Sequence, residues 1–132
     1  MQAEEQRRAE PRGELALRTL AMPKNTNPSG DIFGGWIMSL MDLAAGLAAT
    51  ARANGRVVTA SVSHLSFIAP VQVGDAVCCY AELVRIGRSS MTYNIETWVL
   101  PQRLLGTRTK VTEAQFTMVA VDEGGRPRAV PS

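Results

Sequence analysis

The chain has 132 residues, a formal net charge of +2 at pH 7 and 45% hydrophobic residues. This length suffices for one domain with a buried core, and we expect that domain at residues 14–132, after a frayed tail at 1–13. Lysine and arginine form no basic stripe, which argues against nucleic acid or a membrane surface as partner. The tail is mixed in charge without a signal-peptide core, and the two cysteines form no spaced framework, so we expect a reducing, cytoplasmic setting.

The first predicted element spans residues 14–22, and its pattern allows a strand or a short helix. The next segment, NTNPSGDIFGG, predicts a loop whose glycines permit close approach of the backbone. Residues 36–52 are almost wholly apolar or small and predict a buried helix about 25 Å long, at 1.5 Å per residue.

The same stretch, extended back to Ile32, is long enough to cross a membrane. Its strongly apolar residues favour insertion by about 0.3–0.6 kcal/mol each, whereas one central aspartate opposes it by about 2.5–3.5 kcal/mol. Because these contributions cancel, we expect a helix in a soluble protein. Such an apolar helix must be enclosed on most sides by a sheet, with or without the help of a partner subunit.

Four β-rich runs follow the helix and predict strands at residues 57–67, 76–86, 89–99 and 108–121. In the third run apolar and polar side chains alternate, as in a half-buried antiparallel strand. Hairpin connections between successive runs predict an antiparallel meander. The sequence therefore predicts an α+β domain in which a curled antiparallel sheet wraps around one long central helix.

Asp42 is the one charged residue in the stretch from Gly34 to Ala51. An ionised carboxylate among apolar side chains is costly unless it is hydrogen-bonded, paired or partly wet. Two interpretations stay open: a structural carboxylate bound by a loop or a partner chain, and a functional carboxylate.

Gly34 and Gly35 fall at the expected start of the helix, where unpaired amides and the helix dipole favour a negative charge. A tight turn accounts for the pair, and an oxyanion hole is the functional alternative. Asp42 lies about two turns further along, so the carboxylate and the amides could face one pocket.

The remaining reactive residues carry weaker signals. His64 has no cysteine or carboxylate at ligand spacing, so we expect a strand histidine and no metal site. Cys78 and Cys79 are adjacent, which predicts buried, inert thiols without a disulfide. In the turn at 87–90, Arg88 is either a solvated hairpin residue or a contact for an anion.

Three segments carry specific motifs: LAMPKNTNPSGDIFGGWIMSLMDLAAGLAA, GRVVTASVSHLSFIAPVQVGDAVCCY and VRIGRSSMTYNIETWV. The TN-x-x-GD-x-FGG loop, the M-D pair in the helix, the PV-x-VGD turn and the GRSS hairpin resemble the hotdog-fold acyl-CoA thioesterases, most closely their bacterial YciA-like branch. The resemblance covers about residues 15–131. It implies a hotdog fold, dimers whose sheets join, trimers of such dimers, an acyl-CoA substrate and no cofactor.

The resemblance also implies roles for individual residues. Asp42 matches the helix aspartate that serves as general base or nucleophile. Asn27 matches the loop asparagine that completes the site from the other subunit, and Gly35 matches the glycine whose backbone N–H polarises the thioester carbonyl. The GRSS hairpin matches the part that binds coenzyme A, where the candidate residues are Arg88, Ser89 and Ser90.

The chain departs from the family pattern near the end of the first long strand. Relatives often carry an acidic residue and an M-N-F triplet where this chain has Ser63 and Leu65-Ser66-Phe67. Ala69 stands where a lysine is frequent. If these positions contact the substrate, they affect which acyl chain length the protein prefers and how tightly it binds coenzyme A.

The resemblance implies hydrolysis of acyl-CoA to a fatty acid and coenzyme A. A thiolate is a good leaving group, so a site without a histidine suits this reaction. One alternative is a hotdog hydratase or dehydratase, but those enzymes use a histidine near the helix start, which this sequence lacks. The other is a non-catalytic acyl-CoA sensor, which normally carries a DNA-binding segment that the tail at 1–13 is too small to supply.

Overall fold

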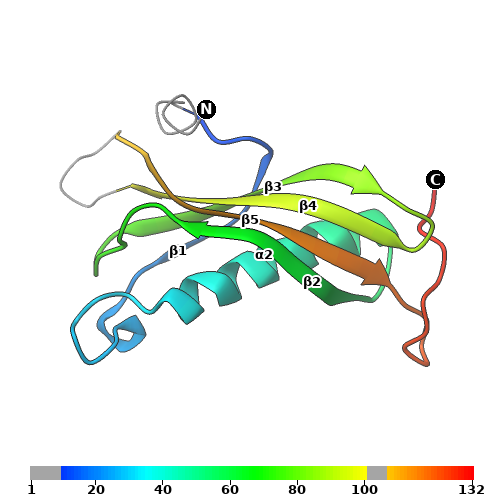
Figure 1. Ribbon diagram of the computed structural model, residues 1–132, viewed down its shortest axis with the longest axis horizontal. Coiled ribbons are helices and arrows are strands. Elements are labelled where there is room, and N and C mark those ends of the chain that lie inside the picture. Colours follow the sequence, from blue (N-terminus) through cyan, green and yellow to red (C-terminus); the bar gives the residue numbers. More distant parts are fainter. Residues whose placement is uncertain (1–9, 101–106) are drawn as a thin grey trace.

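In the computed structural model, which describes residues 10–100 and 107–132, one long helix lies against one face of a five-stranded sheet (Figure 1). The helix is α2 (Gly34–Ala53), preceded by a single 3-10 turn, η1 (Pro23–Asn25). The strands are β1 (Glu14–Leu20), β2 (Val57–Phe67), β3 (Ala76–Ile86), β4 (Ser90–Leu100) and β5 (Thr109–Ala120). The predicted α+β architecture, one long helix on an antiparallel sheet, is confirmed, and the undecided first element is a strand.

The strand order is β1-β3-β4-β5-β2, and every neighbouring pair is antiparallel. The predicted meander is therefore correct for β3, β4 and β5 but wrong for β2, which pairs with β5 instead of β3. The segment after β2 crosses beneath the sheet: the Ile68 amide donates to Val111 of β5, and the Gly74 amide donates to Ala21 after β1. This crossover leaves β1 and β2 as the two edge strands.

The predicted helix is confirmed and is slightly longer than the 36–52 expected. It starts at Gly34 because Phe33, the N-cap residue, is still extended, with φ −63° and ψ 127°. It ends at Ala53 because Asn54 adopts a left-handed conformation, with φ 53°, and its amide donates to Thr50. Asparagine is among the few residues that tolerate this conformation as a C-cap.

One side of α2 packs on the sheet. Its buried residues are Ile37, Met41, Ala44, Ala45, Ala49 and Ala53, which recur at the three- and four-residue spacing of one helix face. The sheet meets them with large buried side chains, among them Met91 and Ile95 of β4 and Phe116 and Met118 of β5. Alanines on the helix therefore let its backbone approach the sheet closely.

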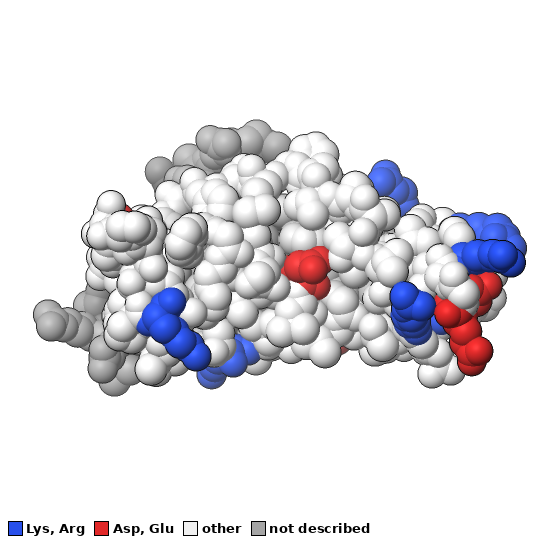
Figure 2. Space-filling view, turned by 90° about the horizontal axis from the view of Figure 1, so that it is seen from below, with Lys and Arg blue, Asp and Glu red and all other residues white. Residues whose placement is uncertain are grey.

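The opposite side of α2 is open in the single chain, so the expected enclosure on most sides is not achieved by the sheet alone. Leu43 and Leu47 are 54% and 50% exposed, and Phe33 before the helix is 53% exposed. Figure 2, seen from below Figure 1 and so from the helix side, shows a broad and largely uncharged surface. An acidic side chain lies near its middle, and the other charged side chains lie mainly toward its ends. The helix has the length and composition of a membrane span, a property that core helices of soluble proteins share.

Candidate active site

Asp42 lies on the exposed side of α2, one position beyond buried Met41 and two before buried Ala44. Its Oδ1 accepts a hydrogen bond of 2.5 Å from the hydroxyl of Thr59 on β2. The helical repeat explains this placement, since the flanking residues turn toward the sheet and Asp42 turns away from it. Of the conditions that make an ionised carboxylate tolerable in an apolar stretch, the structure supplies two, a hydrogen bond and access to water.

The Asp42 carboxylate lines a groove of about 550 Å³ between α2 and β2, a volume typical of ligand-binding pockets. The helix contributes Gly46 and Thr50, one and two turns beyond the carboxylate, and β2 contributes Val57 and Thr59. No sequence motif marks Thr59, because it stands 17 positions from Asp42 and only the packing of β2 beside the helix joins them.

The start of α2 presents unpaired backbone amides, as the sequence predicts. The amides of Trp36 and Ile37 both donate to the Phe33 carbonyl, whereas within the described residues those of Gly34 and Gly35 have no hydrogen-bond partner. A Cβ placed on Gly35 would meet nothing within 4 Å, so this residue borders open space. Such a helix start binds a developing negative charge.

Asp42 and Gly35 of one chain do not meet. They share a side of the helix, but seven residues at 1.5 Å each separate them by about 10 Å along the axis. A reacting group and the donor that polarises the same carbonyl must both lie about 3 Å from it. The expectation that the carboxylate and the amides of one helix face one pocket is therefore wrong for a single chain.

Asn27 shapes the loop before the helix. Its Oδ1 accepts hydrogen bonds from the amides of Ser29, at 2.9 Å, and Asp31, at 3.1 Å. This arrangement uses the acceptor of the side chain and leaves its two Nδ2 hydrogens as donors. No hydrogen bond joins Asn27 to Asp42 in the described part of the chain. The predicted contact is one between two subunits, and it stays a prediction.

The hairpin at 87–90 lies near the other end of the helix. The Gly87 amide donates to the Ser90 carbonyl, and the Arg88 carbonyl accepts from the amide of Val130 in the C-terminal segment. That segment also receives a hydrogen bond of 2.5 Å from Arg52, in the last turn of α2. Arg88 is exposed, so its guanidinium is accessible at the hairpin tip.

The histidine and the cysteines lie outside the groove of Asp42. His64 is exposed, in a left-handed conformation at a bulge of β2. Cys78 and Cys79 are free and buried, and burial raises the pKa of the Cys79 thiol to about 11. Arg18 of β1 donates a hydrogen bond of 3.2 Å to the Cys78 sulfur, a contact that no sequence pattern predicts. Among residues 10–100 and 107–132, no group of three His, Cys, Asp or Glu could hold a metal ion.

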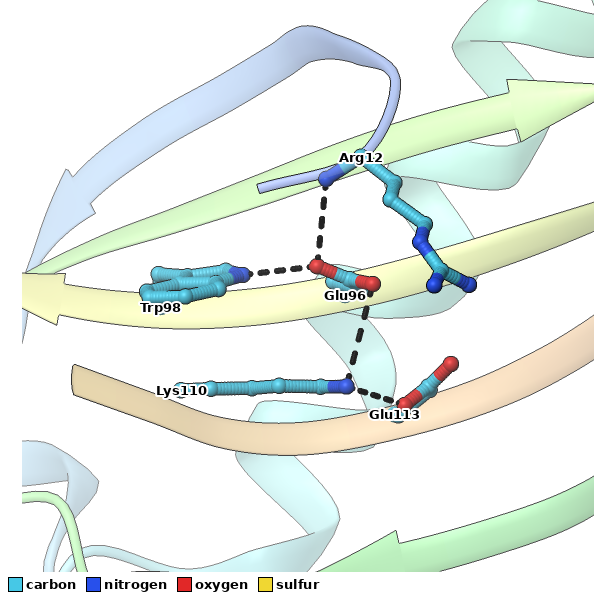
Figure 3. A network of polar contacts seen from close by, with 5 residues as sticks. All are labelled: Arg12, Glu96, Trp98, Lys110 and Glu113. Atoms are coloured by element: carbon cyan, nitrogen blue, oxygen red, sulfur yellow. Dashed lines mark hydrogen bonds and ion pairs between the residues drawn. The ribbon is translucent and has the colours of Figure 1, made fainter. Parts of the chain in front are cut away.

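A charged network lies on the other face of the sheet, as Figure 3 shows. Glu96 of β4, 0% exposed, accepts hydrogen bonds from the Trp98 indole and the Arg12 backbone amide and pairs with Lys110 at 3.7 Å. Lys110 also contacts Glu113. The strand alternation predicted a solvated face here, and that prediction is wrong: β4 is buried on both faces. The network fixes the segment before β1 to the sheet, away from Asp42.

Known proteins resemble this chain over most of its length. The model of the Thioesterase superfamily matches residues 29–105. The acyl-CoA thioester hydrolase YciA of Escherichia coli strain K12 is 54% identical over 123 residues, which cover 92% of this chain and 93% of YciA.

Solved structures agree with the sequence match. The hexameric thioesterase y2039 of Yersinia pestis is 54% identical with a TM-score of 0.89, covering 93% of this chain and 100% of the other. The hexameric hotdog fold thioesterase Cj0915 of Campylobacter jejuni is 37% identical with a TM-score of 0.84, covering 90% and 91%. The predicted hotdog fold is thereby confirmed. With this fold and with more than half of its sequence shared with YciA, the chain belongs to the YciA family of acyl-CoA thioester hydrolases within the thioesterase superfamily.

Proposed function

We propose that this chain hydrolyses acyl-CoA thioesters to a fatty acid and coenzyme A, with Asp42 as its catalytic carboxylate. The observation that carries the proposal is the position of Asp42: accessible, held by Thr59 and set in the wall of a groove of ligand size. A carboxylate with free lone pairs can take a proton from water or attack a carbonyl carbon itself. The family of hydrolases to which the chain belongs supports the choice of substrate.

The Gly35 amide that polarises the thioester at one Asp42 comes from a second copy of the chain. The separation of about 10 Å within one helix supports this arrangement. So do the exposed leucines of α2 and the edge strand β2, whose free backbone groups and exposed Val58 and Val62 suit pairing with another copy. A dimer is then the minimal unit, and three dimers form a hexamer, the assembly named for the Yersinia and Campylobacter relatives.

In this dimer the Gly35 amide and the helix dipole stabilise the oxyanion of the tetrahedral intermediate. On one route Asp42 removes a proton from a water molecule, whose oxygen attacks the carbonyl carbon; the C–S bond then breaks and the thiolate leaves. On the other, an Asp42 oxygen attacks the carbonyl carbon, the C–S bond breaks and the thiolate leaves. Water then cleaves the resulting anhydride into the fatty acid and the Asp42 carboxylate. The Asn27 amide, from the same copy as Gly35, donates a hydrogen bond to the reacting groups.

The hairpin binds the phosphates of coenzyme A. Arg88 is exposed there, and the hydroxyls of Ser89 and Ser90 stand next to it in the chain. The backbone contacts of Arg56 with Val121 and of Ser89 with Ala120 bring a second arginine to this end of the molecule. Arginine with adjacent hydroxyls is a common phosphate-binding combination.

Substitution of the carboxylate tests the proposal. Asp42→Asn removes the base or nucleophile and keeps the shape, so we expect the variant to assemble normally and lose hydrolysis by at least about 100-fold. The measurement is thiol release from a panel of acyl-CoA esters from acetyl to long-chain. Glu123→Gln, the same change at an exposed turn, is the control. Near-normal turnover by Asp42→Asn would overturn the assignment of Asp42 as the catalytic carboxylate. If the unaltered protein bound acyl-CoA without any thiol release, the result would favour a non-catalytic sensor.

A single turnover in heavy-oxygen water tests for direct attack by Asp42. If Asp42 attacks the carbonyl carbon and water then opens the anhydride at the aspartyl carbon, label enters the Asp42 carboxylate. If Asp42 acts as a base, all label appears in the fatty acid. Label in the peptide that contains Asp42, measured by mass spectrometry, therefore identifies direct attack.

A further inference from the structure

A second groove, of about 340 Å³, opens beside the start of α2. It lies between the helix, the end of β2 and the segment that crosses from β2 to β3. The residues that matter for its shape are Gly34, Ile37, Phe67, Ala69, Val71 and Thr112. All are apolar or small except Thr112 of β5, and the volume is near the lower limit of ligand-binding pockets.

This groove begins where the acyl chain of a bound thioester begins. In a thioester the acyl chain is attached to the carbonyl carbon, about 1.5 Å from it, and the Gly35 amide polarises the oxygen on that same carbon. Gly34, the neighbour of Gly35, lines the groove. The Phe67 ring lies 3.5 Å from the point where a Cβ on Gly34 would stand, so it forms the wall of the groove beside Gly34.

Ala69 keeps the groove open. It lines the groove together with Phe67. Because the Ala69 side chain is a single methyl group, it leaves apolar space that a longer side chain would fill.

Thr112 gives the groove one polar feature. The residue is 1% exposed, and its Oγ1 is buried without a hydrogen-bond partner in the described structure. Buried hydroxyls nearly always have a partner, since leaving one unpaired is unfavourable. An oxygen on a bound ligand would supply the partner that the protein does not.

Resting on the proposed function, we propose that this groove binds the acyl chain and that the Thr112 hydroxyl selects short acyl chains carrying an oxygen. The substrate class is short 3-hydroxyacyl or 3-oxoacyl thioesters of coenzyme A, hydrolysed in preference to unsubstituted thioesters of the same length. The apolar walls accommodate the carbon chain, and Thr112 hydrogen-bonds to its substituent.

The test compares 3-hydroxybutanoyl-CoA with butanoyl-CoA, which differ by one oxygen. We expect kcat/KM of the unaltered protein to be about five- to tenfold higher for 3-hydroxybutanoyl-CoA than for butanoyl-CoA. One additional hydrogen bond in the complex produces a preference of this size. Thr112→Val keeps the shape and removes the hydroxyl, so this preference should disappear while butanoyl-CoA is still hydrolysed. Thr117→Val, on the same strand outside the groove, is the matched control and should keep the preference.

A second variant tests the groove itself. Ala69→Leu fills it, so kcat/KM for hexanoyl-CoA should fall at least tenfold relative to that for acetyl-CoA. Equal effects on the two esters would overturn the assignment of the groove. A preference absent from the unaltered protein, or unchanged in Thr112→Val, would overturn the role of Thr112. Failure of the proposed function looks different: no CoA ester would release thiol at all.

Discussion

Thr59 holds the Asp42 carboxylate by donating its hydroxyl hydrogen. A hydrogen bond to a full anion is stronger than one to a neutral carboxyl group. On either chemical route Asp42 loses negative charge as the reaction proceeds, by taking a proton or by forming a bond to carbon. The hydrogen bond therefore stabilises the resting carboxylate more than the transition state, and only this difference affects the rate.

We expect Thr59→Val to raise kcat by about two- to fivefold, which corresponds to about 0.5–1 kcal/mol of lost ground-state stabilisation. Steady-state kinetics on butanoyl-CoA measure the change. Thr59→Ser keeps the hydroxyl and serves as the control, with kcat near that of the unaltered protein. A tenfold fall in Thr59→Val would contradict this account and show that the bond chiefly orients the carboxylate.

Cys79 links stability to alkaline pH. Burial raises the pKa of its thiol from 9.0 to about 11, opposed by a weak contact with the Thr97 hydroxyl at 3.5 Å. The folded chain thus holds this proton more tightly than the unfolded chain. The resulting stability is fully present below pH 9 and is lost as the pH rises through 11, by about 2–3 kcal/mol in total.

Cys79→Ala tests this linkage, because alanine has no proton to lose. Urea unfolding at pH 8 and pH 11 gives the free energy of unfolding of both proteins. The unaltered protein and Cys79→Ala differ in their free energy of unfolding. We expect this difference to change by about 2 kcal/mol, against the unaltered protein, between pH 8 and pH 11. A difference independent of pH would mean that folding does not shift the pKa of the Cys79 thiol.

At the level of elements, α2 combines two chemical functions at different points along its length. Its first turn offers free amides, and its middle offers a carboxylate two turns later. The first turn is also where a proline is tolerated, because the amide it removes has no partner inside the helix. Gly35 meets this condition: its amide is unpaired within the described residues and a side chain there has free space.

We therefore expect Gly35→Pro to fold and assemble but to lose about 100- to 1,000-fold in kcat, the usual effect of removing one oxyanion donor. Gly35→Ala keeps the amide and should retain most activity. Circular dichroism and thermal unfolding establish that both variants fold, and thiol release measures kcat. Equal losses in the two variants would point to a steric effect and away from the amide.

The elements differ in how far their sequences determine them. The helix was predictable within two residues at its start and one at its end because its apolar run is long and Asn54 stops it. The hairpin of β3 and β4 was predictable from the turn at 87–90. The position of β2 was not, because its place beside β5 depends on how the chain crosses under the sheet, and local pattern carries no information on that crossover.

The same limit applies to the site. Asp42 stood out because its charge conflicts with the apolar run around it, and Gly35 because glycines precede the helix. Thr59 gave no signal, since a threonine in a strand is ordinary and only tertiary packing brings it to Asp42. The spacing of Asp42 and Gly35 suggested one shared pocket, yet spacing on one helix sets a distance of about 10 Å that a single thioester does not bridge.

At the scale of the whole molecule, the face that carries α2 is a broad and largely uncharged surface (Figure 2). Asp42 lines a groove between α2 and β2. A surface of this kind, next to an open edge strand, favours association with a second copy. In a twofold dimer each contact occurs twice, so two equivalent sites form. Each site then combines Asp42 of one copy with Gly35 and Asn27 of the other.

Mixed dimers test this arrangement directly. Asp42→Asn and Gly35→Pro chains, each inactive alone, should regain about a quarter of full activity when they assemble together in equal amounts. Half of the dimers are then mixed, and in each mixed dimer one of the two sites keeps both intact groups. Two affinity tags isolate the mixed species, and differently tagged Asp42→Asn chains assembled with each other provide the inactive control. If isolated mixed dimers stay inactive, each site draws both groups from a single chain, and the shared site is disproved.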